Sequence, residues 1–132
     1  MQSKVVLDNA DIARILAGAR EEALRNHWAV TIAVVDDGGH PLALERLDGC
    51  APIGAYIAME KARSAALGRR ETKGYEEMVN GGRTAFISAP MLTSLEGGVP
   101  ILIEGQVVGA VGVSGVKSDQ DAQIAKAGIA GI

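Results

Sequence analysis

The chain is poor in cysteine, in aromatic residues and in basic charge. Its single cysteine, Cys50, excludes an internal disulfide and offers no second thiol for a metal site. Aromatic residues make up 3% of the 132 residues, too few for a platform on which nucleic-acid bases stack. The formal net charge of −3 provides no basic surface for a duplex. We therefore expect no nucleic-acid partner and no metal site built from thiolates.

Long apolar segments are also missing from the sequence. No run reaches the ~18 uncharged residues that a membrane-spanning helix needs, so we expect no membrane partner. Residues 1–8 turn acidic before the apolar segment of a secretory signal develops, which predicts a cytoplasmic protein. A length of 132 residues favours one compact domain, which we assign to residues 1–132.

Glycine is the residue type present in excess. The chain has 17 glycines, nearly twice the usual ~7%, and 48% of its residues are hydrophobic. With so few aromatic residues, the core must be aliphatic and rich in alanine. The glycine-rich segment 109–118 is not a Walker A loop, because Val111 and Val116 stand where that motif requires glycine. Glycine inside an apolar strand instead indicates that a helix packs closely on the sheet.

The pattern of apolar residues and turn residues predicts four helices and five strands. The Asp-Asp-Gly-Gly segment 36–39 and Gly105 form short turns, and short turns join antiparallel neighbours. We therefore predict an α/β fold with a central, largely antiparallel five-stranded sheet and helices on its faces. The predicted helices span residues 9–26, 51–67, 71–79 and from 118 onward, and the predicted strands span 30–35, 42–47, 84–88, 101–103 and 107–114.

Charged residues on and around the second predicted helix suggest an anion-binding site. Arg46 ends a predicted strand, and Lys61 lies within an alanine-rich helix, where a charge needs a partner or a pocket. Guanidinium and ammonium groups are well suited to hold a carboxylate. Glu96 precedes Gly97 and Gly98, whose lack of side chains lets the backbone approach a ligand closely.

Three further residues are candidates for contact with iron. His27 is predicted at a helix end and His40 at the hairpin turn, so both are expected at the surface, and either imidazole suits an axial position. Cys50 is predicted at a helix N-terminus, where the helix dipole favours a thiolate. We favour a buried, inert thiol as the interpretation of Cys50, and a contact with iron requires it to be partly exposed.

Several segments resemble successive signatures of the GlcG/HbpS family, also called haem-degrading-protein-like. The similarity extends to the carboxy-terminal domain of one type of corrinoid adenosyltransferase. The resemblance implies a profilin-like fold and a homo-oligomer, and some members of the family bind haem. Others accompany operons for the catabolism of small acids or diols. The segments that carry the resemblance are residues 34–39, 46–49, 61–62, 97–100, 105, 108–115, 118–121 and 125–128.

The chain departs from the secreted haem sensor of this family in two respects. We expect no export signal, and the sequence lacks a Glu-x-x-Glu pair of the kind that the sensor uses for iron. The similarity therefore does not imply an extracellular redox-sensing role for this chain.

We take the leading function to be a cytoplasmic, oligomeric small-ligand-binding protein that binds haem or a related tetrapyrrole. Arg46 and Lys61 would hold anionic groups, and His40, His27 or Cys50 would contact iron. One alternative is an enzyme acting on a small carboxylic acid from a catabolic pathway. In that case the same Arg and Lys orient the substrate carboxylate, and the general acid or base is Glu60, Glu96, Asp36 or His40. Another alternative is a structural module without a ligand.

Overall fold

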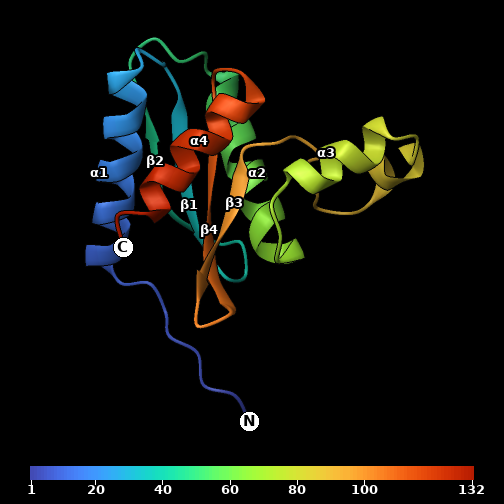
Figure 1. The fold of residues 1–132 in the computed structure, drawn as a ribbon, viewed down its shortest axis with the longest axis horizontal. Helices are drawn as coiled ribbons and strands as arrows, with labels where there is room; N and C mark the ends of the chain where they lie inside the picture. Colours follow the sequence, from blue (N-terminus) through green and yellow to red (C-terminus); the bar gives the residue numbers. More distant parts are fainter.

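The computed structural model describes residues 1–132. Its four strands form one antiparallel sheet in the order β2-β1-β4-β3 (Figure 1). This architecture confirms the predicted α/β class. The elements in chain order are α1 (Asn9–Arg25), β1 (Thr31–Asp36), β2 (Pro41–Arg46), α2 (Ile53–Gly68), α3 (Lys73–Asn80), the 3₁₀ helix η1 (Thr84–Ser88), β3 (Gly98–Ile103), β4 (Gln106–Ser114) and α4 (Ser118–Ile129).

The prediction of a fifth strand over residues 84–88 is wrong. These residues form η1, which lies beside α3, and the two helices form an arm that projects away from the sheet (Figure 1). Within the arm, the rings of Tyr75 and Phe86 stack with centroids 5.2 Å apart. β-branched and aromatic residues favour a strand only where a neighbouring strand offers a pleated surface. The arm offers none, so the segment closes into a 3₁₀ turn.

Local signals in the sequence set the first helix and the first hairpin. The carboxylate of Asp8 accepts a hydrogen bond from the Asp11 N–H at 2.9 Å, and Asp11 returns the bond in a capping box. In the β1–β2 turn, the Asp36 carboxylate accepts bonds from the N–H groups of Gly38 and His40, both at 2.9 Å. Both features agree with the predicted elements.

The sheet separates two helical layers. In Figure 1, α4 crosses in front of the sheet beside α1, and α2 lies behind it. Side chains alternate along β1, so that Ile32 and Val34 contact α1 and α4, whereas Ala33 and Val35 contact α2. The core therefore has a branched aliphatic half and an alanine-rich half.

Glycine allows α2 to lie directly on the sheet. A methyl group on Gly112 would meet the Ala58 carbonyl oxygen and lie 2.9 Å from the Cα of Ala62. A methyl group on Gly98 would lie 2.8 Å from the carbonyl carbon of Lys61. These contacts explain the glycines in β3 and β4 and confirm the predicted close packing of a helix on the sheet.

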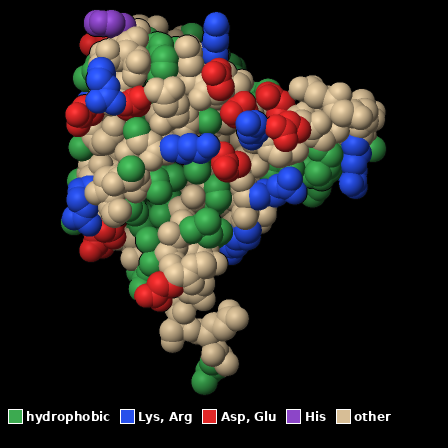
Figure 2. Space-filling model, in the orientation of Figure 1, with side chains coloured by type: hydrophobic (Ala, Val, Ile, Leu, Met, Phe, Trp, Pro, Cys, Tyr) green, Lys and Arg blue, Asp and Glu red, His purple; other side chains and the backbone are tan.

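The surface carries charges of both signs. On the face in Figure 2, acidic and basic side chains are interspersed over α1, α4 and the arm, and hydrophobic side chains are exposed below α4. None of the helices has both the length and the apolar character that crossing a membrane requires.

Candidate functional site

The structure does not bring Arg46 and Lys61 together. Arg46 is exposed at the end of β2, opposite Thr31 of β1, whereas Lys61 bonds to β4. No side-chain hydrogen bond or ion pair joins Arg46 to Lys61 or to the partners of Lys61, and strand β1 separates β2, which carries Arg46, from β4. That Arg46 and Lys61 bind one carboxylate together stays a prediction, and their positions do not support it.

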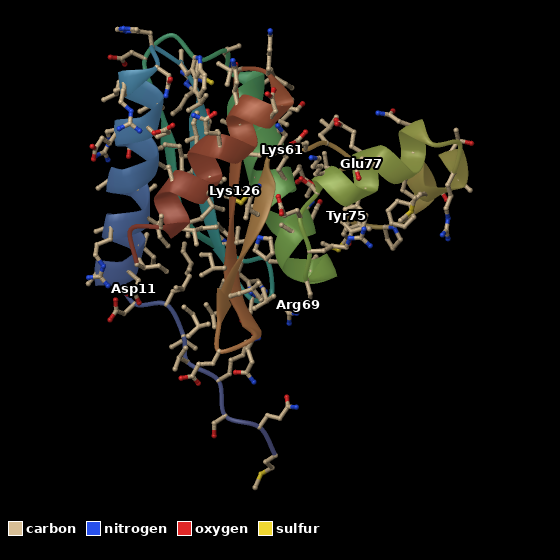
Figure 3. All side chains as sticks on the ribbon, in the orientation of Figure 1. Asp11, Lys61, Arg69, Tyr75, Glu77 and Lys126 are labelled. Carbon is tan, nitrogen blue, oxygen red and sulfur yellow. The ribbon has the colours of Figure 1, made fainter.

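Lys61 belongs to a buried ion pair. Its Nζ donates to the Val113 carbonyl and to the Asp121 carboxylate, both at 3.0 Å, and the side chain is 3% exposed. Asp121 also accepts a bond from the Val116 N–H at 3.2 Å. Burial raises the pKa of the Asp121 carboxyl above its ordinary value, while Lys61 and the Val116 N–H act in the opposite direction. The pair, which we call the Lys61–Asp121 clamp, joins α2 to α4. Lys61 is labelled in Figure 3.

Gly97 and Gly98 lie against this clamp. A methyl group on Gly97 would lie 2.8 Å from the Nζ of Lys61, and Gly98 donates its N–H to the hydroxyl of Thr72 at 2.9 Å. Both glycines are buried, and Glu96, just before them, is half-buried. Lys61 and the two glycines therefore lie together, and the observed close approach of the glycine backbone is to Lys61. Their role in holding a ligand stays a prediction.

Cys50 is buried beneath the first turn of α2. Its Sγ lies 3.3 Å from the Thr31 hydroxyl and 3.7 Å from the Ser114 carbonyl, and 8% of the residue is exposed. A methyl group on Gly54 would lie 2.7 Å from this sulfur, so the helix leaves no space beside it. This placement agrees with the interpretation of Cys50 as a buried thiol, since a ligand could reach it only if α2 moved.

The two histidines lie at opposite ends of the sheet. His40 is on the β1–β2 turn, where its Nδ1 is 3.1 Å from the Asp36 carboxylate and its side chain is 78% exposed. His27 follows α1 in the left-handed region, at φ 58°. Of the two, only His27 lines a cavity, and that cavity has a volume of about 410 Å³.

The walls of the His27 cavity are mostly apolar. The last turn of α1, the α1–β1 loop and the segment after β2 supply its other lining residues, which are Leu24, Trp28, Ala29, Leu47 and Asp48. Two backbone bonds of 2.9 Å fix these walls, one from the Trp28 N–H to Ala23 and one from the Leu47 N–H to Val30. We call this space the Trp28 cavity.

The donor set of the Trp28 cavity fits a haem. An imidazole is a common axial ligand of haem iron, and apolar and aromatic walls suit the porphyrin ring. Residue types and spacing did not single out Trp28, Leu24 or Leu47, because they converge from separate segments. The one available signal was the chain's only tryptophan standing next to a candidate histidine.

The fold defines an α/β protein whose single antiparallel sheet lies between two helical layers. Within that class, the chain belongs to the family described as haem degrading protein HbpS-like, whose family model matches residues 7–130. This match confirms the resemblance derived from the sequence.

Three relatives illustrate the similarity. Protein GlcG of Escherichia coli (strain K12) is 67% identical over 114 residues, which cover 86% of this chain and 85% of GlcG. The crystal structure of PduOC in complex with haem has a TM-score of 0.87 at 25% identity, covering 97% of this chain and 96% of the other. A double mutant of HbpS from Streptomyces reticuli has a TM-score of 0.88 at 29% identity, covering 98% and 89%.

Proposed function

We propose that the protein binds haem or a related tetrapyrrole in the Trp28 cavity, with His27 as the axial ligand of the iron. The observation that carries the proposal is an exposed histidine that lines a mostly apolar cavity, in which Asp48 is the one acidic lining residue. The similarity to PduOC, crystallised with haem, supports the same class of ligand. When bound, haem supplies an iron centre that accepts an imidazole nitrogen.

The loop that carries His27 is held in place before any ligand arrives. The His27 N–H donates to the Leu24 carbonyl at 3.2 Å, and the neighbouring Trp28 N–H donates to the Ala23 carbonyl. A fixed backbone reduces the entropy lost when a ligand binds. Asp48 also lines the cavity, and its negative charge would direct the haem propionates toward solvent.

A haem titration followed at the Soret band tests this proposal. Wild-type protein is expected to give a saturable spectral shift, and His27→Ala is expected to weaken binding about tenfold or more, equivalent to about 1.4 kcal/mol. His40→Ala is the matched control, because it removes the other exposed imidazole from the opposite end of the sheet. A spectrum that stays that of free haem, or binding lost in His40→Ala and kept in His27→Ala, would contradict the proposal.

The alternative of an enzyme acting on a small carboxylic acid rested on Arg46 and Lys61. The Lys61 ammonium bonds to Asp121 and Val113 inside the protein, and Arg46 lies on the far side of β1. Because neither geometry nor burial favours that pair as a substrate site, haem binding is the function that we put forward.

We also propose that the protein is a homo-oligomer that works in the cytoplasm. Large apolar side chains are exposed on the outward side of α2, at Ile53 and Tyr56, and in or just after the arm, at Ile87 and Met91. Burying such side chains between copies would stabilise an assembly. Light scattering should give a mass that is a multiple of 13.6 kDa, and a mass of 13.6 kDa alone would contradict this proposal.

A further inference from the structure

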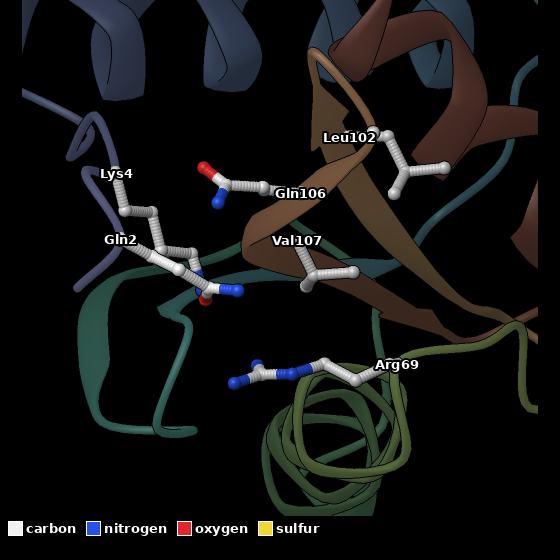
Figure 4. Close-up of a pocket in the computed structure, with 7 residues that line it drawn as sticks. Gln2, Lys4, Arg69, Leu102, Gln106 and Val107 are labelled. Atoms are coloured by element: carbon white, nitrogen blue, oxygen red, sulfur yellow. The ribbon is translucent and has the colours of Figure 1, made fainter.

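A second cavity lies at the end of the sheet away from His27, with a volume of about 510 Å³ (Figure 4). Three parts of the chain that are distant in sequence surround it: the N-terminal segment, the residue after α2 and the β3–β4 hairpin. We call it the hairpin cavity. Its lining residues are Gln2, Lys4, Arg69, Leu102, Gly105, Gln106 and Val107.

Two cations face the hairpin cavity from different segments. The Nζ of Lys4 is 3.0 Å from the Asp37 carboxylate, and Arg69 uses its Nη1 on the carbonyls of Asp37 and Ala66. These bonds hold both side chains in place, and they leave two N–H groups of Lys4 and the Nε and Nη2 groups of Arg69 without a protein partner. The cavity therefore has spare donors that carry positive charge.

The remaining walls are of two kinds. Gln2 and Gln106 contribute carboxamides, which donate and accept hydrogen bonds, and Leu102 and Val107 contribute an apolar surface on the hairpin (Figure 4). No carboxylate is among the lining residues. Positive charge on one side and hydrocarbon on another match a small amphiphilic anion.

We propose that the hairpin cavity binds a short aliphatic carboxylate. Its carboxylate group lies between Lys4 and Arg69, because a guanidinium fork and an ammonium both donate to carboxylate oxygens. Its hydrocarbon part lies against Leu102 and Val107. The cavity is separate from the Trp28 cavity, so this inference does not rest on haem binding.

Calorimetric titration with butyrate tests the proposal, with 1-butanol as the uncharged comparison. Butyrate is expected to bind saturably and 1-butanol is not. A haem propionate carries the same carboxylate chemistry, so the titration is repeated on haem-saturated protein. Unchanged butyrate affinity supports a site for free acids, whereas competition by haem, or equal behaviour of butyrate and 1-butanol, would overturn the proposal.

Variants then locate the butyrate site. Arg69→Gln and Lys4→Gln should each weaken butyrate binding about tenfold, and Lys117→Gln, at an exposed lysine outside the cavity, should leave it unchanged. Asp37→Asn should tighten binding severalfold, because the Asp37 carboxylate competes for Lys4. A gain in affinity cannot come from misfolding. Wild-type affinity in both cation variants, or weaker binding in Asp37→Asn, would contradict the proposal.

Discussion

On one face of the sheet α2 lies so close that its backbone contacts glycine, whereas on the other face branched side chains hold α1 and α4 away. The close face is built on Gly112, Ala58 and Ala62, and the branched face on fully buried residues such as Ile32 and Ile124. The comparison shows two solutions to packing a helix on a sheet, one through backbone contact and one through interlocking side chains.

The two faces also treat their polar groups differently. Beneath α2, the thiol of Cys50 and the ammonium of Lys61 are buried and hydrogen-bonded, and no residue of α2 lines any of the five cavities. At the end of the branched face, the Trp28 cavity opens beside an accessible imidazole. The polar residues beneath α2 are therefore bonded inside the fold, whereas the site that we propose for haem combines His27, a candidate from the sequence, with apolar residues that the sequence did not single out.

The largest effect is expected from breaking the Lys61–Asp121 clamp. Lys61→Met removes one partner and leaves a carboxyl group buried without its counter-charge, which should cost about 3–5 kcal/mol of the free energy of unfolding. Urea unfolding measures this loss, and Lys117→Met, at an exposed lysine, is the control. The double variant Lys61→Met/Asp121→Leu should recover part of the loss. A cost below about 1 kcal/mol would show that the Lys61–Asp121 clamp contributes little to holding α2 on the sheet.

Gly112→Ala should be nearly as damaging. Its methyl group would meet the Ala58 carbonyl and push α2 off the sheet, at a cost of about 3 kcal/mol in the same urea assay. Gly105→Ala is the matched control, because nothing lies within 4 Å of its added methyl and only its φ of 78° is unfavourable, at about 1 kcal/mol. Equal losses of unfolding free energy in the two variants would show that close contact with α2 is not what makes Gly112 intolerant of a methyl group.

A smaller loss is expected on the branched face. Ile32→Val removes one methylene from the layer between the sheet and α1, where neighbouring side chains can partly close the gap, so the cost should be about 1 kcal/mol. Urea unfolding of Ile32→Val and Gly112→Ala under the same conditions ranks the two losses of stability. If Ile32→Val cost more than Gly112→Ala, the branched face would be the less tolerant of the two.

The smallest effect concerns an ion pair between α1 and β2. Both oxygens of Glu45 accept bonds from Arg20, at 2.7 and 2.6 Å, and these bonds hold the pKa of the Glu45 carboxyl below its ordinary 4.5. Because the folded state binds this proton less tightly, the pair stabilises the fold above about pH 5 and the gain is lost as the pH falls below that.

Arg20→Ala should therefore lower stability by less than about 1 kcal/mol at neutral pH, since the pair is partly exposed. The difference from wild type should shrink as the pH falls below about 5. Thermal unfolding at a series of pH values measures it, and a difference that does not change with pH would contradict the assigned cause. Burial raises the pKa of Asp121, so the two carboxyls shift in opposite directions.

Residues with strong local signals were predicted well from the sequence. The helix that begins at Asn9, the turn at Gly39 and the close packing at Gly112 follow from helix periodicity, turn chemistry and the size of glycine. Segment 84–88 was predicted wrongly because a strand depends on a neighbour that the arm does not provide.

The candidate site was harder to predict, because its residues meet only through the fold. Lys61 was expected to need a partner, but that partner, Asp121, lies 60 residues away. Trp28 and Leu47 come from loops on opposite sides of the first hairpin and meet at the cavity only because β1 pairs with β2. Short-range sequence patterns carry no information about contacts between residues that are far apart in the sequence.

The most direct test of the central claim uses the chain's only tryptophan, Trp28, as a reporter. Gallium protoporphyrin, a diamagnetic analogue of haem, shifts nuclear resonances close to its ring. We expect the indole N–H signal of Trp28 to shift strongly and saturably on titration, while the amide signals of Gly38 and Gly39, in the turn next to His40, stay in place. A stationary Trp28 signal together with shifts at this turn would contradict the Trp28 cavity as the haem site.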